Sequence, residues 1–123
     1  MEVPILKQGE ILIATVQAAL TDTDLLQLRR ALVEKVAKAR ARAITIDLTA
    51  MDVMDSFASR TMREVAHMIR LRGAETVIVG IQPDVAFAMV QLGLSMGGVT
   101  TALDLEEGLA FLDKRIKDRS SAS

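Results

Sequence analysis

The chain has 123 residues, of which half are hydrophobic, with 15 basic and 16 acidic side chains. This length and apolar content predict a single domain with a substantial core. The absence of cysteine excludes disulfides and thiolate metal sites, and the single histidine, His67, excludes a multi-histidine metal site. The balanced charge and the lack of tyrosine and tryptophan argue against nucleic acid as a partner.

The sequence also lacks the apolar segments that direct proteins to membranes. Residues 1–10 contain charges and a proline but no apolar run of the length that a secretory leader needs. No stretch approaches the roughly 20 apolar residues that span a bilayer. We therefore expect a cytoplasmic protein with no membrane partner, no metal and no organic cofactor.

The first part of the chain predicts a hairpin and a helix. Residues 3–7 and 11–16 are typical of strands, and the turn at 8–10 joins them. Residues 21–24 (Thr-Asp-Thr-Asp) offer N-cap side chains for a helix. The apolar residues that follow recur at helical spacing: Leu25, Leu28, Leu32, Val33 and Val36.

Strands and helices alternate in the rest of the chain. The predicted elements are a buried strand over 43–48, an amphipathic helix from Ser56 to about Gly73, a strand over 75–81, a helix over 84–92 with Pro83 in its first turn, a short strand over 99–101, and a helix opened by a capping box of Asp104 and Glu107. We expect the domain to cover residues 1–117 and the tail, residues 118–123, to be frayed.

This order of elements predicts the fold class. A hairpin followed by alternating helices and strands indicates an α/β fold, in which a mixed, mostly parallel sheet carries about four helices. The connection over 49–55 then leaves the carboxyl end of a parallel strand, where open α/β sheets place their sites.

The helix from Ser56 has two distinct faces. Ala58, Met62, Val65, Ala66 and Ile69 fall on one side of a helical wheel and predict the core stripe. The opposite side carries the polar residues Ser56, Arg60, Arg63 and His67. A phosphoryl group on Ser56 would be tolerated at a helix N-terminus, and the arginines could offset part of its charge.

Spacing alone leaves two interpretations of Ser56 open. Serine is common as a plain N-cap, and Asp55 could cap the helix in its place. We predict a partner-binding surface made of Asp47, Asp52, Asp55, Arg60 and Arg63. Its three aspartates would repel a phosphoryl group, and they also suit caps, turns and solubility. Met51 and Met54 favour packing in the core or under the loop over a cofactor site, and if exposed they would suit an adaptable contact surface.

An enzyme is the less favoured alternative. A small nucleotide-binding or hydrolytic enzyme could use a doubly wound fold, but the glycines form neither a dinucleotide fingerprint nor a P-loop. No nucleophile has a histidine at a recognisable spacing. We therefore predict that the chain has no catalytic residues and acts by binding other proteins.

Several segments resemble the STAS domains of anti-anti-sigma factors. The run at 46–57 (Ile-Asp-Leu-Thr-Ala-Met-Asp-Val-Met-Asp-Ser-Phe) is similar to the STAS signature, in which an Asp-Ser pair stands at a helix start. The segments at 4–7, 80–83 and 101–106 extend the resemblance, in order, to the small RsbS-like STAS proteins of the bacterial stressosome. Phe57 and Ala58 stand where free anti-anti-sigma factors tend to have a second serine and a glycine, which favours the RsbS-like group.

The resemblance implies a regulatory scaffold. RsbS-like proteins assemble with RsbR-type STAS co-antagonists and sequester an RsbT-type serine/threonine kinase, which leaves after phosphorylating the scaffold, and a phosphatase resets the serine. The phosphoacceptor position corresponds to Ser56, and Ser59 is the second choice. The alternative within the family is a free anti-anti-sigma factor that binds an anti-sigma kinase as a monomer.

Overall fold

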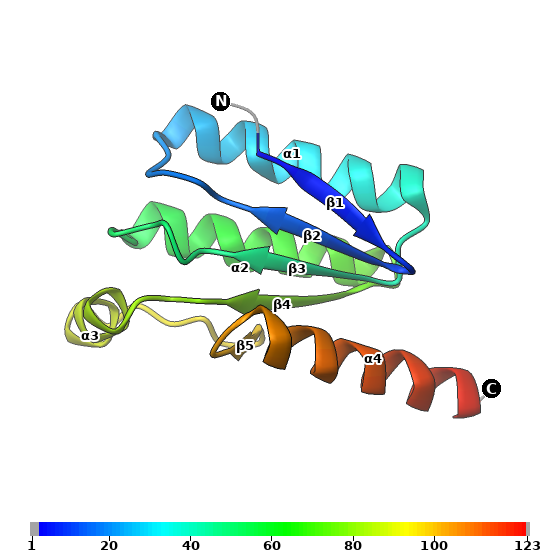
Figure 1. The fold of residues 1–123 in the computed structure, drawn as a ribbon. Helices are drawn as coiled ribbons and strands as arrows, with labels where there is room; N and C mark the ends of the chain where they lie inside the picture. Colours follow the sequence, from blue (N-terminus) through cyan, green and yellow to red (C-terminus); the bar gives the residue numbers. More distant parts are fainter. Residues whose placement is uncertain (1–2, 123) are drawn as a thin grey trace.

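A five-stranded sheet runs through the molecule in the order β1-β2-β3-β4-β5 (Figure 1). The structure is a computed structural model that describes residues 3–122. Its elements are β1 (Ile5–Gln8), β2 (Ile11–Thr15), α1 (Asp22–Ala39), β3 (Ala43–Asp47), α2 (Ser56–Leu71), β4 (Glu75–Val79), α3 (Pro83–Gln91), β5 (Thr100–Ala102) and α4 (Leu105–Ala122). β1 pairs with β2 antiparallel, and the other three pairings are parallel. The predicted fold class and element order are confirmed.

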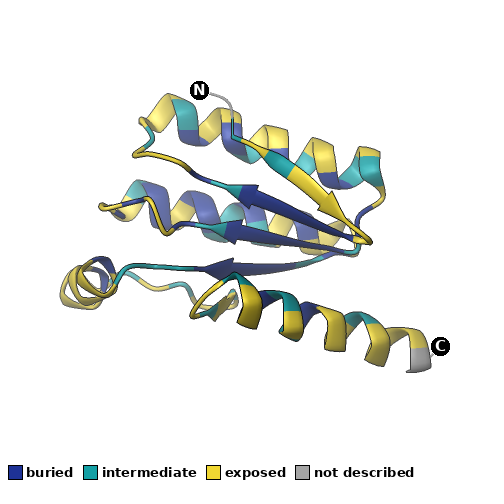
Figure 2. Cartoon of the chain, viewed as in Figure 1, coloured by how far each residue is buried: buried dark blue, intermediate teal, exposed yellow. Residues whose placement is uncertain are grey.

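The two faces of the sheet pack against different helices. Residues such as Leu12, Ile44 and Ile78 join the larger core cluster, which includes the buried stripes of α1 and α2. The alternate residues, among them Val77 and Val79, pack with Leu112 of α4 in a smaller cluster on the other face. Strands β2 to β4 are buried between these layers, while β1 is largely exposed (Figure 2).

The helix ends follow the predicted local chemistry. Thr21 caps α1 in a capping box with Asp24, and Pro83 occupies the first turn of α3. Gly73 follows α2 with φ 84°, a conformation that glycine adopts without steric cost. Before α4, the Glu107 N–H donates to the Asp104 carboxylate, while the Glu107 carboxylate accepts from Leu103 N–H.

The carboxyl-terminal helix continues beyond the predicted domain boundary. α4 extends to Ala122, so the segment predicted as a tail begins inside a helix, and Ser123 lies outside the described residues. The boundary at residue 117 stays a prediction. None of the helices in the described range combines the length and the apolar character that crossing a bilayer requires.

Candidate functional site

The N-terminus of α2 presents Ser56 to solvent. Asp55 is the N-cap, and its carboxylate accepts a 2.8 Å hydrogen bond from the Ala58 N–H. Ser56 is the first helical residue and is exposed, and its hydroxyl makes no hydrogen bond to any described residue. Of the two capping alternatives, the structure therefore selects Asp55, which leaves the Ser56 hydroxyl available for other chemistry.

The connection between β3 and α2 is anchored by methionines. Met51 and Met54 are buried in the main core cluster, which confirms the favoured interpretation that they pack in the core and rules out the alternative of an exposed methionine surface. Their side chains pack beneath the connection and hold it against the core. Asp52 and Val53 lie between them and are exposed.

Val53 is a surface residue that the sequence reasoning missed. It is one of the exposed large hydrophobic residues, and it stands beside Asp52 on the connection that leads to Ser56. Met51 and Met54 are buried and the two residues between them are exposed, a pattern that is visible only in the structure. Val53 adds an apolar contact to an otherwise acidic surface.

Asp47, at the end of β3, holds the start of the connection through hydrogen bonds to Thr49. Its carboxylate accepts hydrogen bonds from the N–H of Thr49 at 2.9 Å and from the Thr49 hydroxyl at 2.6 Å. The Thr49 carbonyl in turn accepts a 2.6 Å bond from the side-chain amide of Gln82, which joins this connection to the start of α3. Asp47 is half-buried. Its hydrogen bonds show that it stabilises the connection, at the edge of the predicted partner-binding surface.

The polar face of α2 is confirmed, but its arginines have separate contacts. The Arg63 guanidinium donates to the Ser95 carbonyl at 2.8 Å, which ties it to the segment after α3. The Arg60 guanidinium lies over the Phe57 ring, 5.7 Å from its centroid, one turn from Ser56. Arg60, Arg63 and His67 line one open hollow of about 410 Å³ on this face.

Ser59, the second candidate, faces the core. It is 1% exposed, and its hydroxyl finds no hydrogen-bond partner among the described residues. A kinase would reach this hydroxyl only after α2 had opened locally. The two serines of the first turn of α2 thus differ sharply in access.

The three aspartates do not converge on a common point. In the part of the chain that the structure describes, no three His, Asp or Glu side chains are grouped so that they could hold a metal ion. Asp47 holds Thr49, Asp55 caps α2 and Asp52 faces solvent. Each aspartate thus has a separate place on or beside the connection, and the three form no metal-ligand set.

Comparison with known proteins gives similarity at two levels. By sequence, the chain is 31% identical over 78 residues to the RsbT co-antagonist protein RsbRA of Bacillus subtilis, covering 63% of this chain and 28% of that protein. RsbRD of the same organism is 28% identical over 85 residues, which cover 69% of this chain and 31% of the relative. The chain therefore spans less than a third of these curated relatives.

Solved structures match nearly the whole chain. A serine-to-glutamate variant of RsbS from Moorella thermoacetica is 29% identical with a TM-score of 0.80, over 95% of this chain and 99% of that one. A chain of the stressosome, described as a signal integration and transduction hub, is 31% identical with a TM-score of 0.77, over 92% and 98% of the two chains. The anti-sigma factor antagonist SpoIIAA, at 12% identity and a TM-score of 0.67, shares the fold.

The family itself is settled by a match along most of the sequence. The family model that describes the STAS domain matches residues 2–108, a range that contains the sheet and the Ser56 connection. The fold is the one found in anti-sigma factor antagonists and stressosome components. The chain belongs to the STAS domain family.

Proposed function

We propose that this chain is a non-catalytic scaffold subunit of a stressosome-type signalling complex, and that phosphorylation of Ser56 releases a bound switch kinase. The observation that carries the proposal is the exposed hydroxyl of Ser56 on a helix that Asp55 already caps. Similarity to RsbS over nearly the whole length of both chains supports the choice of complex.

The structural position of Ser56 suits a charge switch. A phosphoryl group brings roughly −1.5 to −2 charges at neutral pH. The first turn of a helix accepts negative charge, because its N–H groups and dipole favour anions. Modification at Ser56 would therefore leave α2 folded while it changes the surface around it.

The surroundings determine what the added charge does. Asp55 directly precedes Ser56, Asp52 stands four positions before it on the same connection, and both are exposed. Charges within a Debye length of about 8–10 Å of one another interact. A partner that docks on this acidic surface with a complementary basic patch meets a different potential after phosphorylation. Val53 and Arg60 supply an apolar contact and an exposed cation in the same region.

We assign three partners to the scaffold. The first is an RsbR-type STAS co-antagonist that builds the homo- and hetero-oligomeric complex, because RsbR proteins are among the relatives and a stressosome chain shares the fold. The second is an RsbT-type serine/threonine kinase, which docks near Ser56. The third is a phosphatase that resets the serine. The proposed place of action is the cytoplasm.

The free anti-anti-sigma factor remains the second candidate function. SpoIIAA shares the fold at 12% identity, whereas RsbS reaches 29%. The larger identity and the Phe57-Ala58 pair favour the scaffold. A chain that stays monomeric with an RsbR-type protein present would favour the second candidate.

The test compares two serines on one helical turn. Ser56→Ala should abolish the main phosphorylation by the cognate kinase, because it removes the exposed hydroxyl and leaves the Asp55 cap in place. Ser59→Ala is the matched control and should leave phosphorylation intact, since its hydroxyl is buried. Intact-mass measurement after incubation with kinase and ATP gives the extent of phosphorylation of both variants. Full modification of the Ser56→Ala protein would show that Ser56 is not the acceptor.

A further inference from the structure

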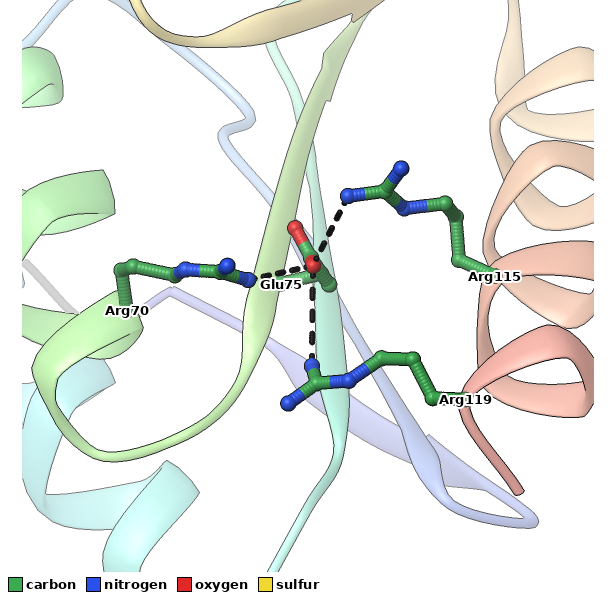
Figure 3. Close-up of polar contacts among 4 residues, drawn as sticks. All are labelled: Arg70, Glu75, Arg115 and Arg119. Carbon is green, nitrogen blue, oxygen red and sulfur yellow. Dashed lines mark hydrogen bonds and ion pairs between the residues drawn. The ribbon is translucent and has the colours of Figure 1, made fainter. Parts of the chain in front are cut away.

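The end of the sheet opposite Ser56 carries a cluster of three arginines around one glutamate (Figure 3). Glu75 is the first residue of β4 and is 14% exposed by its side chain. Its Oε1 atom lies 2.5 Å from Arg70 Nη1, 3.2 Å from Arg115 Nη2 and 3.5 Å from Arg119 Nη1. Because Arg70 comes from α2 and the other two from α4, one carboxylate meets helices from both faces of the sheet.

This cluster holds more positive charge than Glu75 can neutralise. Three guanidiniums face one carboxylate, and within residues 3–120 no second carboxylate pairs with any of them. The Arg115 guanidinium also lies over the Phe111 ring, 5.7 Å from its centroid, which restricts its orientation. Glu75 therefore orients the three arginines, and the cluster of these four residues carries a net charge of two positive units.

A cleft of about 290 Å³ opens beside the cluster. Arg70, Glu75 and Arg115 line it together with Thr76 and Thr100. It lies at the free edge of β4, since pairing with β5 begins only at Val77. The Thr76 residue is 8% exposed, and its hydroxyl has no hydrogen-bond partner in the described part of the chain.

We propose that this cleft binds a tetrahedral dianion, either inorganic phosphate or the phosphate of a small phosphomonoester. A dianion matches the surplus of two positive charges in the whole cluster, of which Arg70 and Arg115 line the cleft and Arg119 pairs with Glu75. Each arginine uses one terminal nitrogen on Glu75, and a guanidinium has five N–H donors in a planar fork that suits phosphate oxygens. The ligand would also give the buried Thr76 hydroxyl the partner that it lacks.

A nitrogen-15 NMR titration with inorganic phosphate, at constant ionic strength and above the second pKa of phosphate, tests this site. The amide signals of Thr76, Gly98 and Thr100 should shift and saturate with phosphate and with sulfate, but not with chloride. Linear, unsaturated shifts, or equal shifts with chloride, would overturn the proposal and leave the cluster as a link between α2 and α4.

Two variants locate the anion. Arg115→Gln should weaken phosphate binding by about tenfold, the loss expected for one charge-assisted hydrogen bond. Arg30→Gln removes the same charge from an exposed pair with Glu34 on α1 and should leave binding unchanged. An equal loss in both variants would indicate nonspecific attraction and contradict a site. Thermal unfolding verifies that each variant is folded.

The buried hydroxyl of Thr76 suggests a third variant. Thr76→Val keeps a β-branched side chain in β4 and should weaken phosphate binding, whereas unchanged binding would contradict the proposed position of the anion. Titration with glycerol phosphate then distinguishes the sources. Tighter binding than inorganic phosphate assigns the site to a phosphomonoester, and weaker binding assigns it to the free ion.

Discussion

At the scale of single residues, the conformation of the connection after β3 depends on Gly80 as well as on the hydrogen bonds between Asp47 and Thr49. Gly80 has φ 77°, and a Cβ atom built there would lie 2.1 Å from the Thr49 hydroxyl oxygen and 3.0 Å from the Asp47 carboxylate. The hydrogen bonds that shape the approach to Ser56 are thus possible only because Gly80 has no side chain. This contact joins residues from two strands, which explains why sequence spacing does not reveal it.

Gly80→Ala should therefore destabilise the protein more than Gly73→Ala does. Both glycines have positive φ, which costs an alanine about 1–2 kcal/mol, but a Cβ at Gly73 meets nothing within 4 Å. The clash at Gly80 adds roughly 1–3 kcal/mol of overpacking. Urea unfolding of the two variants measures the difference. Equal losses would show that Thr49 moves aside without cost.

At the scale of elements, α1 begins with a capping box that has a pH dependence. The hydrogen bond that the Thr21 N–H donates to the Asp24 carboxylate, together with a side-chain hydrogen bond between the two residues, lowers the pKa of the Asp24 carboxyl from its ordinary value of 3.8. A carboxyl whose pKa is lowered by folding stabilises the folded state when it is ionised. This contribution is present above pH 3.8 and is lost as the pH falls through the lower, folded-state pKa.

Asp24→Asn should remove part of the acid sensitivity of α1. The difference in unfolding free energy between the natural protein and the variant should be largest near neutral pH and should shrink at pH values below 3.8. Urea unfolding over a pH series measures it, and a carbon-13 NMR titration reads the Asp24 pKa directly. A difference that grows on acidification would contradict a lowered pKa.

Helix α4 is attached to the sheet at few points. Leu112 is its one fully buried large side chain among the described residues, and it packs with Val77 and Val79. Gly108 allows close approach, because a Cβ there would lie 2.6 Å from a Val79 methyl. Arg115 and Arg119 add the ion pairs to Glu75. This narrow attachment makes Leu112 the critical packing residue of the helix.

Leu112→Ala should cost about 2–5 kcal/mol of stability, the range for a leucine truncated in a core. Leu109→Ala is the matched control, and it should cost less because Leu109 is only half-buried. Chemical unfolding monitored by far-ultraviolet circular dichroism measures both variants. Similar losses would mean that Leu109 contributes as much packing as Leu112 and would contradict the critical role of Leu112.

The elements were predictable because their signals are local. Apolar spacing and caps predicted four helices and five strands. Of the predicted core stripe of α2, Ala58, Met62, Val65 and Ile69 are buried, whereas Ala66 is half-buried. Strand ends shifted by one or two residues, since pairing with neighbours decides them. The Arg63 bond to Ser95 and the Glu75 cluster depend on contacts between distant segments, which periodicity does not encode.

At the scale of the whole molecule, the two candidate sites lie at opposite ends of the parallel strands. Ser56 follows the carboxyl end of β3, whereas Glu75 begins β4, which runs parallel to β3. Added charge at Ser56 therefore leaves the arginine cluster and most of the surface unchanged. A scaffold built this way could change its affinity for one partner while it keeps its contacts with others.

Ser56→Asp should separate kinase retention from assembly. The substitution adds one negative charge at the first helical position, where the helix dipole favours it by about 0.3–1 kcal/mol, so the melting temperature should hold or rise slightly. We expect the variant to form a complex of unchanged size with an RsbR-type partner and to retain less kinase in a pull-down. The loss of kinase should be smaller than the loss caused by phosphorylation, which adds more charge.

Ser120→Asp, the same change at the far end of α4, is the control and should retain the kinase fully. Equal retention by the natural protein and the Ser56→Asp variant would contradict the charge switch, even if Ser56 were the residue modified.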